Sequence, residues 1–276
     1  MAASMKAMIF AAGLGTRLRP LTDTMPKALV KVCGKTLLEY SIEKLKAAGF
    51  TQIVINVHHF ADMIREYVRE KGSFGIEISF SDESDLLRET GGGIRHAAAL
   101  LNDGEPFLVH NVDILSNLDI PAMVGGYNAA SASSAENGES HLATLLVSER
   151  VTERYLLFDN EARLVAWMNV RTGEVRSPFE ELKRNPVADG ETFDCEAYTR
   201  EYGLKKYAFD GVHIISPEIF KLMVDKPEKF SIIGFYLSYC DKWPITAHIQ
   251  PGLRVVDVGK VNSIQKAEEL VADVHL

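Results

Sequence analysis

Short apolar runs alternate with amphipathic segments along the first half of the chain. The stretches between the apolar runs carry hydrophobic residues at helical spacing. The runs themselves predict strands at residues 7–11, 52–57, 76–80, 107–111 and 142–147. This alternation is typical of βαβ units, so we expect an α/β fold with a mainly parallel sheet.

Helix signals lie between the predicted strands. Thr36 and Glu39 form a capping box, and Gly49 is placed to end the helix that begins there. A second helix is predicted over residues 61–71, and a third after the glycines at 91–93. Helices that connect successive parallel strands cover both faces of a sheet, which predicts a three-layer, Rossmann-like arrangement.

The second half of the chain has a different pattern. Alternation and turn signals over residues 155–176 predict antiparallel strands, and another strand is expected at 207–215. Residues 129–140 are rich in Ala, Ser, Asn and Gly, which predicts a surface loop. Segment 178–205 is polar and lacks a clear period, whereas Asn262 is placed to cap a last helix.

Composition places the chain among globular proteins. Of its 276 residues, 46% are hydrophobic and 25% are charged, which disfavours a disordered or fibrous class. We expect one domain over residues 1–276, with halves at 5–150 and 151–276. The net charge of −8 provides no field that attracts nucleic acid, so an anionic ligand requires a local group of basic residues.

Cysteine usage and hydropathy indicate a cytoplasmic protein. Cys33, Cys195 and Cys240 form an odd set without a C-x-x-C pair, which disfavours a disulfide framework or a thiolate zinc site. The apolar run at residues 7–12 is too short to span a membrane. We therefore expect no membrane partner, and the sequence leaves the oligomeric state open.

The most informative stretch is residues 11–27, AAGLGTRLRPLTDTMPK, directly after the first predicted strand. Gly13 and Gly15 allow backbone N–H groups to turn toward a phosphate, and Arg17 and Lys27 add positive charge. An ordinary glycine-rich turn is the alternative for a lone G-x-G, but the length and basic content of this loop favour a polyphosphate site.

Two familiar phosphate motifs do not fit. A dinucleotide fingerprint needs a third glycine where Leu18 stands, and an acid near residue 58, where the chain has histidines. Gly34-Lys35-Thr36 has the ending of a P-loop, but Leu29 occupies the place of its leading glycine. Thr36 is better explained as the helix cap.

Five segments together resemble the sugar-1-phosphate nucleotidylyltransferases. They span most of the chain in that family's order, and they are G-x-G-T-R followed by Pro-Lys, Thr90-Gly91-Gly92-Gly93, Val109-His110-Asn111-Val112-Asp113, Phe209-Asp210-Gly211-Val212 and Val256-Asp257-Val258-Gly259. The wording ETGGGI is most similar to the uridylyltransferases for N-acetylmuramic acid 1-phosphate and to the mannose-1-phosphate guanylyltransferase-like enzymes.

The resemblance implies transfer of a nucleoside monophosphate from a nucleoside triphosphate, UTP or GTP, to a sugar 1-phosphate of the N-acetylmuramate or mannose type, with release of pyrophosphate. It implies Arg17 and Lys27 as catalytic residues, and Asp113 with Asp257 as ligands of Mg²⁺. Carboxylate oxygens at two strand ends suit that hard cation, and charge on phosphate oxygens is what basic side chains stabilise.

The resemblance also assigns the two substrates to backbone and side-chain groups. The residues that it places against the nucleotide are Ala11, Ala12, Gly13, Gly15, Thr16, Gly91 and Gly92. Asn169 and Gly211 are placed against the sugar. The polar, poorly periodic character of segment 178–205 predicts that parts of it complete the sugar side as a lid. The chain departs from the family at Val112, where a glycine is usual, and at residues 166–169, where a Glu-Lys-Pro segment is usual.

Two other functions remain as alternatives. A pyrophosphorylase-like subunit that binds or regulates without turnover need not retain all four charged site residues. A glycosyltransferase of similar fold usually carries an Asp-x-Asp motif, whereas Asp113-Ile114-Leu115 lacks the second acid. Pyrophosphate release distinguishes these alternatives from nucleotidyl transfer.

Overall fold

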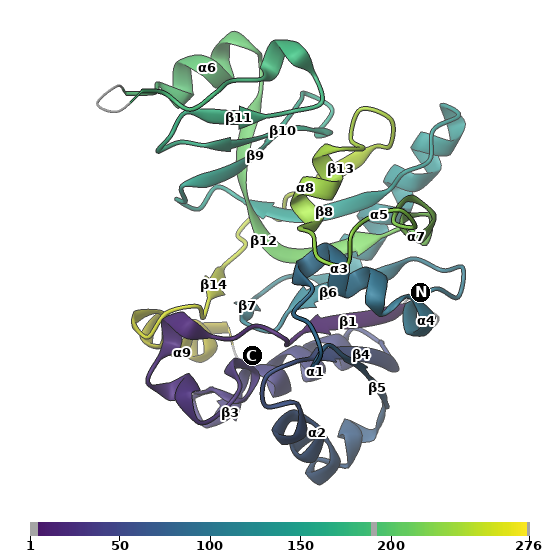
Figure 1. Ribbon diagram of the computed structural model, residues 1–276, viewed down its shortest axis with the longest axis vertical. Coiled ribbons are helices and arrows are strands. Elements are labelled where there is room, and N and C mark those ends of the chain that lie inside the picture. The colour runs from purple at the N-terminus through teal and green to yellow at the C-terminus, as the bar shows by residue number, and fades with distance from the viewer. Residues whose placement is uncertain (1–4, 189–191, 275–276) are drawn as a thin grey trace.

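A ten-stranded mixed sheet runs through the protein in the computed structural model, which describes residues 5–188 and 192–274 (Figure 1). Its strands are β1 (Lys6–Phe10), β4 (Gln52–Val57), β5 (Glu77–Asp82), β6 (Phe107–Asn111), β8 (Ala143–Ser148), β9 (Arg154–Phe158), β10 (Leu164–Asn169), β11 (Glu174–Arg176), β12 (Lys205–Ile215) and β13 (Ile245–His248). Two short ladders join β2 (Lys31–Val32) to β3 (Lys35–Thr36) and β7 (Ile114–Ser116) to β14 (Val255–Asp257).

The strand order is β11-β10-β9-β12-β6-β1-β4-β5, with β8 paired to β12 and to β13. Strands β6, β1, β4 and β5 pair in parallel, whereas β12 pairs antiparallel with β6, β8 and β9. The register of β12 against β8 shifts between Phe209 and His213. The expected α/β fold with a mainly parallel central sheet is therefore confirmed, and antiparallel strands extend it.

Helices cover both faces of the sheet. They are α1 (Leu37–Ala47), α2 (Ala61–Glu70), α3 (Glu89–His96), α4 (Ala98–Leu101), α5 (Ile120–Glu136), α6 (Cys195–Glu201), α7 (Ile219–Leu222), α8 (Ile232–Leu237) and α9 (Asn262–Val274). One apolar core holds α1, α2, α5 and α9 on one face, and a second core holds α3, α4, α7 and α8 on the other. This is the three-layer arrangement that the sequence predicts.

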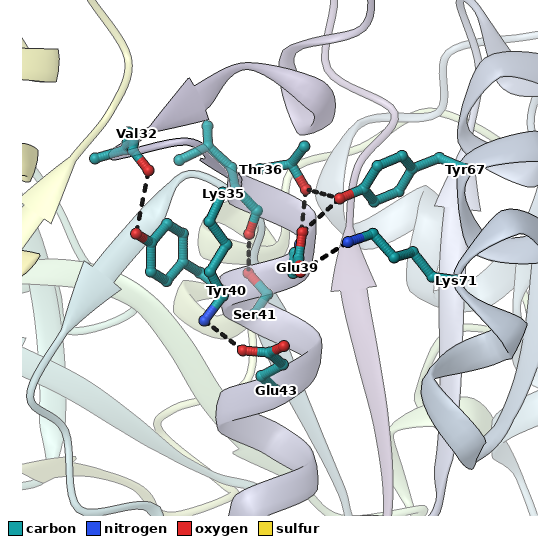
Figure 2. A network of polar contacts seen from close by, with 10 residues as sticks. Val32, Lys35, Thr36, Glu39, Tyr40, Ser41, Glu43, Tyr67 and Lys71 are labelled. Carbon is teal, nitrogen blue, oxygen red and sulfur yellow. Dashed lines mark hydrogen bonds and ion pairs between the residues drawn. The ribbon is translucent and has the colours of Figure 1, made fainter. Parts of the chain in front are cut away.

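The start of α1 shows how local chemistry fixes an element next to the site. Thr36 Oγ1 accepts the Glu39 N–H at 3.1 Å, a cap that stabilises a helix by about 1 kcal/mol. The Glu39 carboxylate turns away from the cap and accepts hydrogen bonds from Tyr67 and Lys71 (Figure 2). The capping box is thus half formed, and Glu39 ties α1 to the end of α2. Gly49, at φ 93°, follows the helix end as predicted.

The expected surface loop at residues 129–140 is wrong, because α5 continues to Glu136. Asp119 caps this helix, with Oδ1 accepting the Ala122 N–H at 2.9 Å. Buried Met123 and Tyr127 anchor its first turns, and the alanines that follow have high helix propensity. The C-terminal turns are largely exposed, so they lack the apolar periodicity that marks a helix in the sequence.

Strands β9 to β11 and helix α6 extend the sheet as a lobe of their own (Figure 1). Strands β9, β10 and β11 pair antiparallel, as predicted for residues 155–176, and they pack with α6 around a small core of their own. Segment 178–205 contains a 3₁₀ turn at Glu180–Leu182 and α6, and its residues 189–191 lie outside the described residues. The strand expected at 207–215 lies within β12, and α9 begins at Asn262.

Candidate active site

A crevice opens at the carboxyl ends of β1, β4 and β6. Strand β1 lies between β4 and β6, and the sequence order of the strands reverses at this point of the sheet. The connections on the two sides of β1 therefore run in opposite directions and leave a gap. That gap is where ligands bind in open α/β sheets. A cavity of about 280 Å³ occupies this position. Its lining residues are Phe10, Ala11, Ala12, Gly13, Lys27, Asn56, Glu83, Leu87, Glu89, Thr90, Asn111, Val112 and Asp113.

The start of the loop after β1 is fixed by hydrogen bonds to a side chain of β4 that the sequence analysis missed. Asn56, at the end of β4, accepts the N–H groups of Ala11 and Ala12 at 2.7 and 3.3 Å. Its amide nitrogen donates to Glu83 at 2.8 Å, and both side chains are buried. Ala11 and Ala12 line the cavity, and their N–H groups are already bonded to Asn56. A polar residue inside the apolar run of β4 was the available signal.

The remainder of the loop is a series of tight turns. Gly15 adopts φ 63°, and its carbonyl accepts hydrogen bonds from the Leu18 N–H and the Thr22 hydroxyl, both at 2.8 Å. A Cβ at Gly15 would lie 2.9 Å from Thr22, so glycine is required there for packing as well as for φ. Thr16 and Arg17 follow in an exposed 3₁₀ turn. These turns bring the chain back so that Lys27 lines the cavity.

The two predicted metal ligands lie side by side although 144 positions separate them in the numbering. Asp113 follows β6, and Asp257 ends β14, where it is the register partner of Ile114. The Val258 N–H donates to the Asp113 carbonyl at 2.8 Å. The short β7–β14 ladder therefore brings Asp257 against the segment that carries Asp113.

Basic side chains surround this carboxylate pair. Lys27 is ion-paired with Asp113. A Cβ at Gly259 would lie 2.7 Å from Asp257 Oδ1 and 3.1 Å from Arg17 Nη2, so the guanidinium and that carboxylate share one side of Gly259. Loss of hydration raises the pKa of Asp257, and the neighbouring Asp113 carboxylate raises it further, while the cations lower it.

The donor set fits Mg²⁺. Among residues 5–188 and 192–274, no group of three or more His, Cys, Asp and Glu side chains forms a closed metal site. Mg²⁺ requires only one or two protein carboxylates when substrate phosphates complete its octahedral shell. Asp113 and Asp257 offer that number of hard oxygen ligands, and burial, followed by the nearby Asp113 carboxylate, raises the pKa of Asp257.

The glycines at residues 91–93 have a packing role. Gly91 and Gly92 lie in α3 and donate their N–H groups to the Phe230 carbonyl at 2.9 and 3.2 Å. A Cβ at Gly92 would lie 2.1 Å from the Glu228 carbonyl. The glycines thus let segment 228–230 pack directly on α3. At this edge the cavity is lined instead by Leu87, Glu89 and Thr90.

The two predicted sugar-side residues have different surroundings. Gly211, at φ 70° within the irregular part of β12, lies against the crevice, because a Cβ there would be 2.6 Å from Asn111 Nδ2. Asn169 ends β10, and its Oδ1 accepts the N–H groups of Arg171 and Thr172 at 2.9 and 3.3 Å. That side chain closes the β10–β11 turn, and Asn169 is not among the residues that line the cavity.

His58 and the three cysteines are not among the residues that line the cavity. His58 Nδ1 is 2.6 Å from the Glu83 carbonyl, which holds that ring in place. The three cysteines are free thiols.

Across the described ranges, no helix combines the length and apolar character needed to cross a membrane.

Residues 6–155, more than half of the chain, match the family model of nucleotidyl transferases. The chain belongs to the nucleotidyl transferase family. The chain is 50% identical over 109 residues to the N-acetylmuramate alpha-1-phosphate uridylyltransferase of Caulobacter vibrioides, covering 39% of this chain and 45% of that protein. It is 48% identical over 118 residues to the enzyme of the same name from Neisseria meningitidis, covering 43% and 51%. The chain thus spans about half the length of these curated relatives.

Solved structures of low sequence identity share the fold of this chain over nearly all of its residues. A UDP-glucose pyrophosphorylase complexed with UDP-glucose superposes with a TM-score of 0.68 at 17% identity, covering 98% of each chain. The inositol-1-phosphate CTP transferase from T. maritima gives a TM-score of 0.67 at 16% identity, covering 99% of this chain and 96% of that one. The predicted fold class is therefore confirmed.

Proposed function

We propose that this protein transfers a nucleoside monophosphate from a nucleoside triphosphate to a sugar 1-phosphate and releases pyrophosphate. The observation that carries the proposal is the meeting of Lys27 and Arg17 with Asp113 and Asp257 beside the cavity. Two basic side chains suit the negative charge of a polyphosphate, and two carboxylates suit the metal ion that accompanies it. A binding subunit without turnover has no need for this arrangement.

The residues have distinct roles in the proposed reaction. The sugar phosphate oxygen attacks the α-phosphorus in line with the leaving pyrophosphate, so catalysis rests on positioning and charge stabilisation. Lys27, only 11% of whose side chain is exposed, stabilises charge on the transferring phosphoryl group. Arg17, on the exposed turn of the loop, binds the leaving pyrophosphate. Asp113 and Asp257 hold Mg²⁺, which neutralises phosphate charge.

We propose uracil as the base and an N-acetylmuramate-type sugar, with the reaction supplying a cell-wall precursor in the cytoplasm. The names of the two uridylyltransferase relatives support this choice over guanine and mannose. Residues 5–150 supply the nucleotide side and 151–276 the sugar side of one domain. The net charge of −8 disfavours nucleic acid as a partner.

Pyrophosphate release tests the proposal. UTP, GTP, CTP and dTTP are each combined with N-acetylmuramic acid, mannose and glucose 1-phosphates, and products are identified by mass spectrometry. We expect pyrophosphate and a nucleotide-diphosphate sugar, fastest with UTP and N-acetylmuramic acid 1-phosphate. No pyrophosphate from any pair would favour the non-catalytic alternative, and nucleoside diphosphate release from a nucleotide sugar would favour a glycosyltransferase.

A further inference from the structure

A second arginine, and a third basic residue besides Lys27 and Arg17, is fixed next to Gly211, which lies against the crevice. Arg150 follows β8, and its Nε donates to Asp210 Oδ1 at 2.6 Å while Nη2 donates to the Phe209 carbonyl at 2.9 Å. A guanidinium has five N–H donors, and the described contacts use two of them. With 38% of the side chain exposed, the remaining donors are accessible to an anion.

The partner of this arginine is a carboxylate of unusual burial. Asp210 has no exposed surface, and Arg150 is its ion-pair partner within the described part of the chain. Burial raises the pKa of the Asp210 carboxyl, although the guanidinium acts in the opposite direction. A buried carboxylate costs several kcal/mol in lost hydration, so it is poor as a source of stability alone. Its effect here is to hold a surface arginine in one orientation.

The fixed Arg150 side chain lies next to residues that border the crevice. The guanidinium of Arg150 is bonded to Asp210, the residue immediately before Gly211. It bonds β12 immediately before Gly211, where that strand passes Asn111 at the end of β6. Arg150 is therefore held beside the crevice, next to Gly211 and the end of β6.

Topology places the cations on opposite sides of β6. That strand, which leads to Asp113, pairs with β1 on one edge and with β12 on the other (Figure 1). Arg17 and Lys27 come from the loop after β1, whereas Arg150 is fixed to β12. An in-line displacement needs its incoming and outgoing groups on opposite sides of the α-phosphorus. If pyrophosphate leaves on the β1 side, the attacking phosphate enters on the β12 side.

We propose that Arg150 binds the phosphate of the sugar 1-phosphate and that Asp210 is the positioning residue that orients its guanidinium. This inference rests on the proposed nucleotidyl transfer and adds the group that receives the acceptor. It gives the acceptor phosphate a cation of its own, separate from those that bind the nucleoside triphosphate.

Steady-state kinetics separate this role from a structural one. Arg150→Ala is expected to raise the KM for the sugar 1-phosphate roughly 10- to 100-fold, the effect of losing a charge-assisted contact. The KM for the nucleoside triphosphate should change less than twofold. Arg150→Lys should be intermediate, and Asp210→Asn should raise the same KM by a smaller factor. The matched control is Arg163→Ala, since Arg163 is 33% exposed and pairs with Glu139 away from the crevice residues.

Two further measurements keep the outcome unambiguous. Arg150→Ala leaves a buried carboxylate unpaired, so the double variant Arg150→Gln/Asp210→Asn, which carries neither charge, provides a folded comparison. Calorimetric titration with inorganic phosphate, at the same ionic strength, should show at least tenfold weaker binding to this double variant than to wild type and to Arg163→Ala.

The results distinguish failure of the inference from failure of the proposed function. Active wild type with an unchanged sugar 1-phosphate KM in the folded Arg150 variants would overturn the role of Arg150 alone. Equal rises in both KM values would show a structural pair instead. Inactive wild type would refute the proposed function, and phosphate titration would then still decide whether Arg150 contributes to an anion site.

Discussion

The Lys27 ammonium is ion-paired with the Asp113 carboxylate, which joins the loop after β1 to the end of β6. The exposed fractions of the two side chains are 11% and 18%, so water screens the pair only in part. This contact holds the end of the loop after β1 against the residue that follows β6. It also means that a change in either residue alters the charge around the other.

Replacement of Lys27 should therefore act mainly on the chemical step. Lys27→Ala removes a preorganised charge that stabilises the transition state, and a loss of kcat of roughly 10²- to 10³-fold is expected, as for one lost oxyanion-type donor. Arg17→Ala should behave similarly. Lys31→Ala, at an exposed position of β2, is the control and should retain wild-type kcat. A near-normal kcat for Lys27→Ala in the pyrophosphate assay would contradict the assigned role.

Metal dependence should report on the carboxylate pair. Asp113→Asn and Asp257→Asn each remove one hard ligand, so both should lose activity at low Mg²⁺ and recover part of it at high Mg²⁺. Excess EDTA should abolish wild-type turnover and leave the far-UV circular dichroism spectrum unchanged. The exposed Asp225→Asn is the control. Full activity of either site variant at limiting Mg²⁺ would assign these carboxylates a structural role.

Two helical glycines should respond in opposite ways to the same substitution. Gly92→Ala places a methyl group 2.1 Å from the Glu228 carbonyl, which must displace segment 228–230, so we expect a lower melting temperature. Gly125→Ala, in α5, meets no atom within 4 Å and should be stabilising by about 0.5–1 kcal/mol. Differential scanning calorimetry measures both. Equal melting temperatures would show that α3 does not depend on this close approach.

Acid should destabilise the fold through buried histidines. Burial lowers the pKa of His213 to about 3 and the pKa values of His110 and His141 to about 4. An unfolded histidine titrates near pH 6.5, so the folded state binds fewer protons below that pH. The contribution of these neutral histidines to the free energy of unfolding is fully present above about pH 6.5. It is lost as the pH falls toward 4, by about 1.4 kcal/mol per pH unit for each histidine.

Urea unfolding at pH 7.5, 6 and 5 tests this dependence. His110→Asn should reduce the slope of unfolding free energy against pH by about one proton below pH 6.5. The control is His59→Asn, because His59 is exposed and its substitution should leave the slope unchanged. An identical slope for the His110 variant would indicate that this ring is protonated in the folded protein.

The sequence by itself determined the elements whose signals are local. The apolar runs of β1, β4 and β6 match their strands because burial on both faces leaves a continuous hydrophobic stretch. Thr36 and Gly49 marked the ends of α1 because a cap and a left-handed residue act within one turn. The glycines and basic residues of segment 11–27 predict a polyphosphate site, and this stays a prediction, whereas the family that the same motif indicates is confirmed.

Only the tertiary structure decided which residues meet across long separations. Asn56 bonds Ala11, and Arg150 bonds Asp210, because strand order and register bring β4 to β1 and β8 to β12; no local pattern encodes those neighbours. The role of Gly92 likewise depends on segment 228–230, far along the chain. The C-terminal part of helix α5 was missed because its exposed turns have no apolar period. Those turns are helical because the capped and buried first turns nucleate the helix, and extending a helix costs less than starting one. Local chemistry sets the elements, and packing between distant elements sets the site.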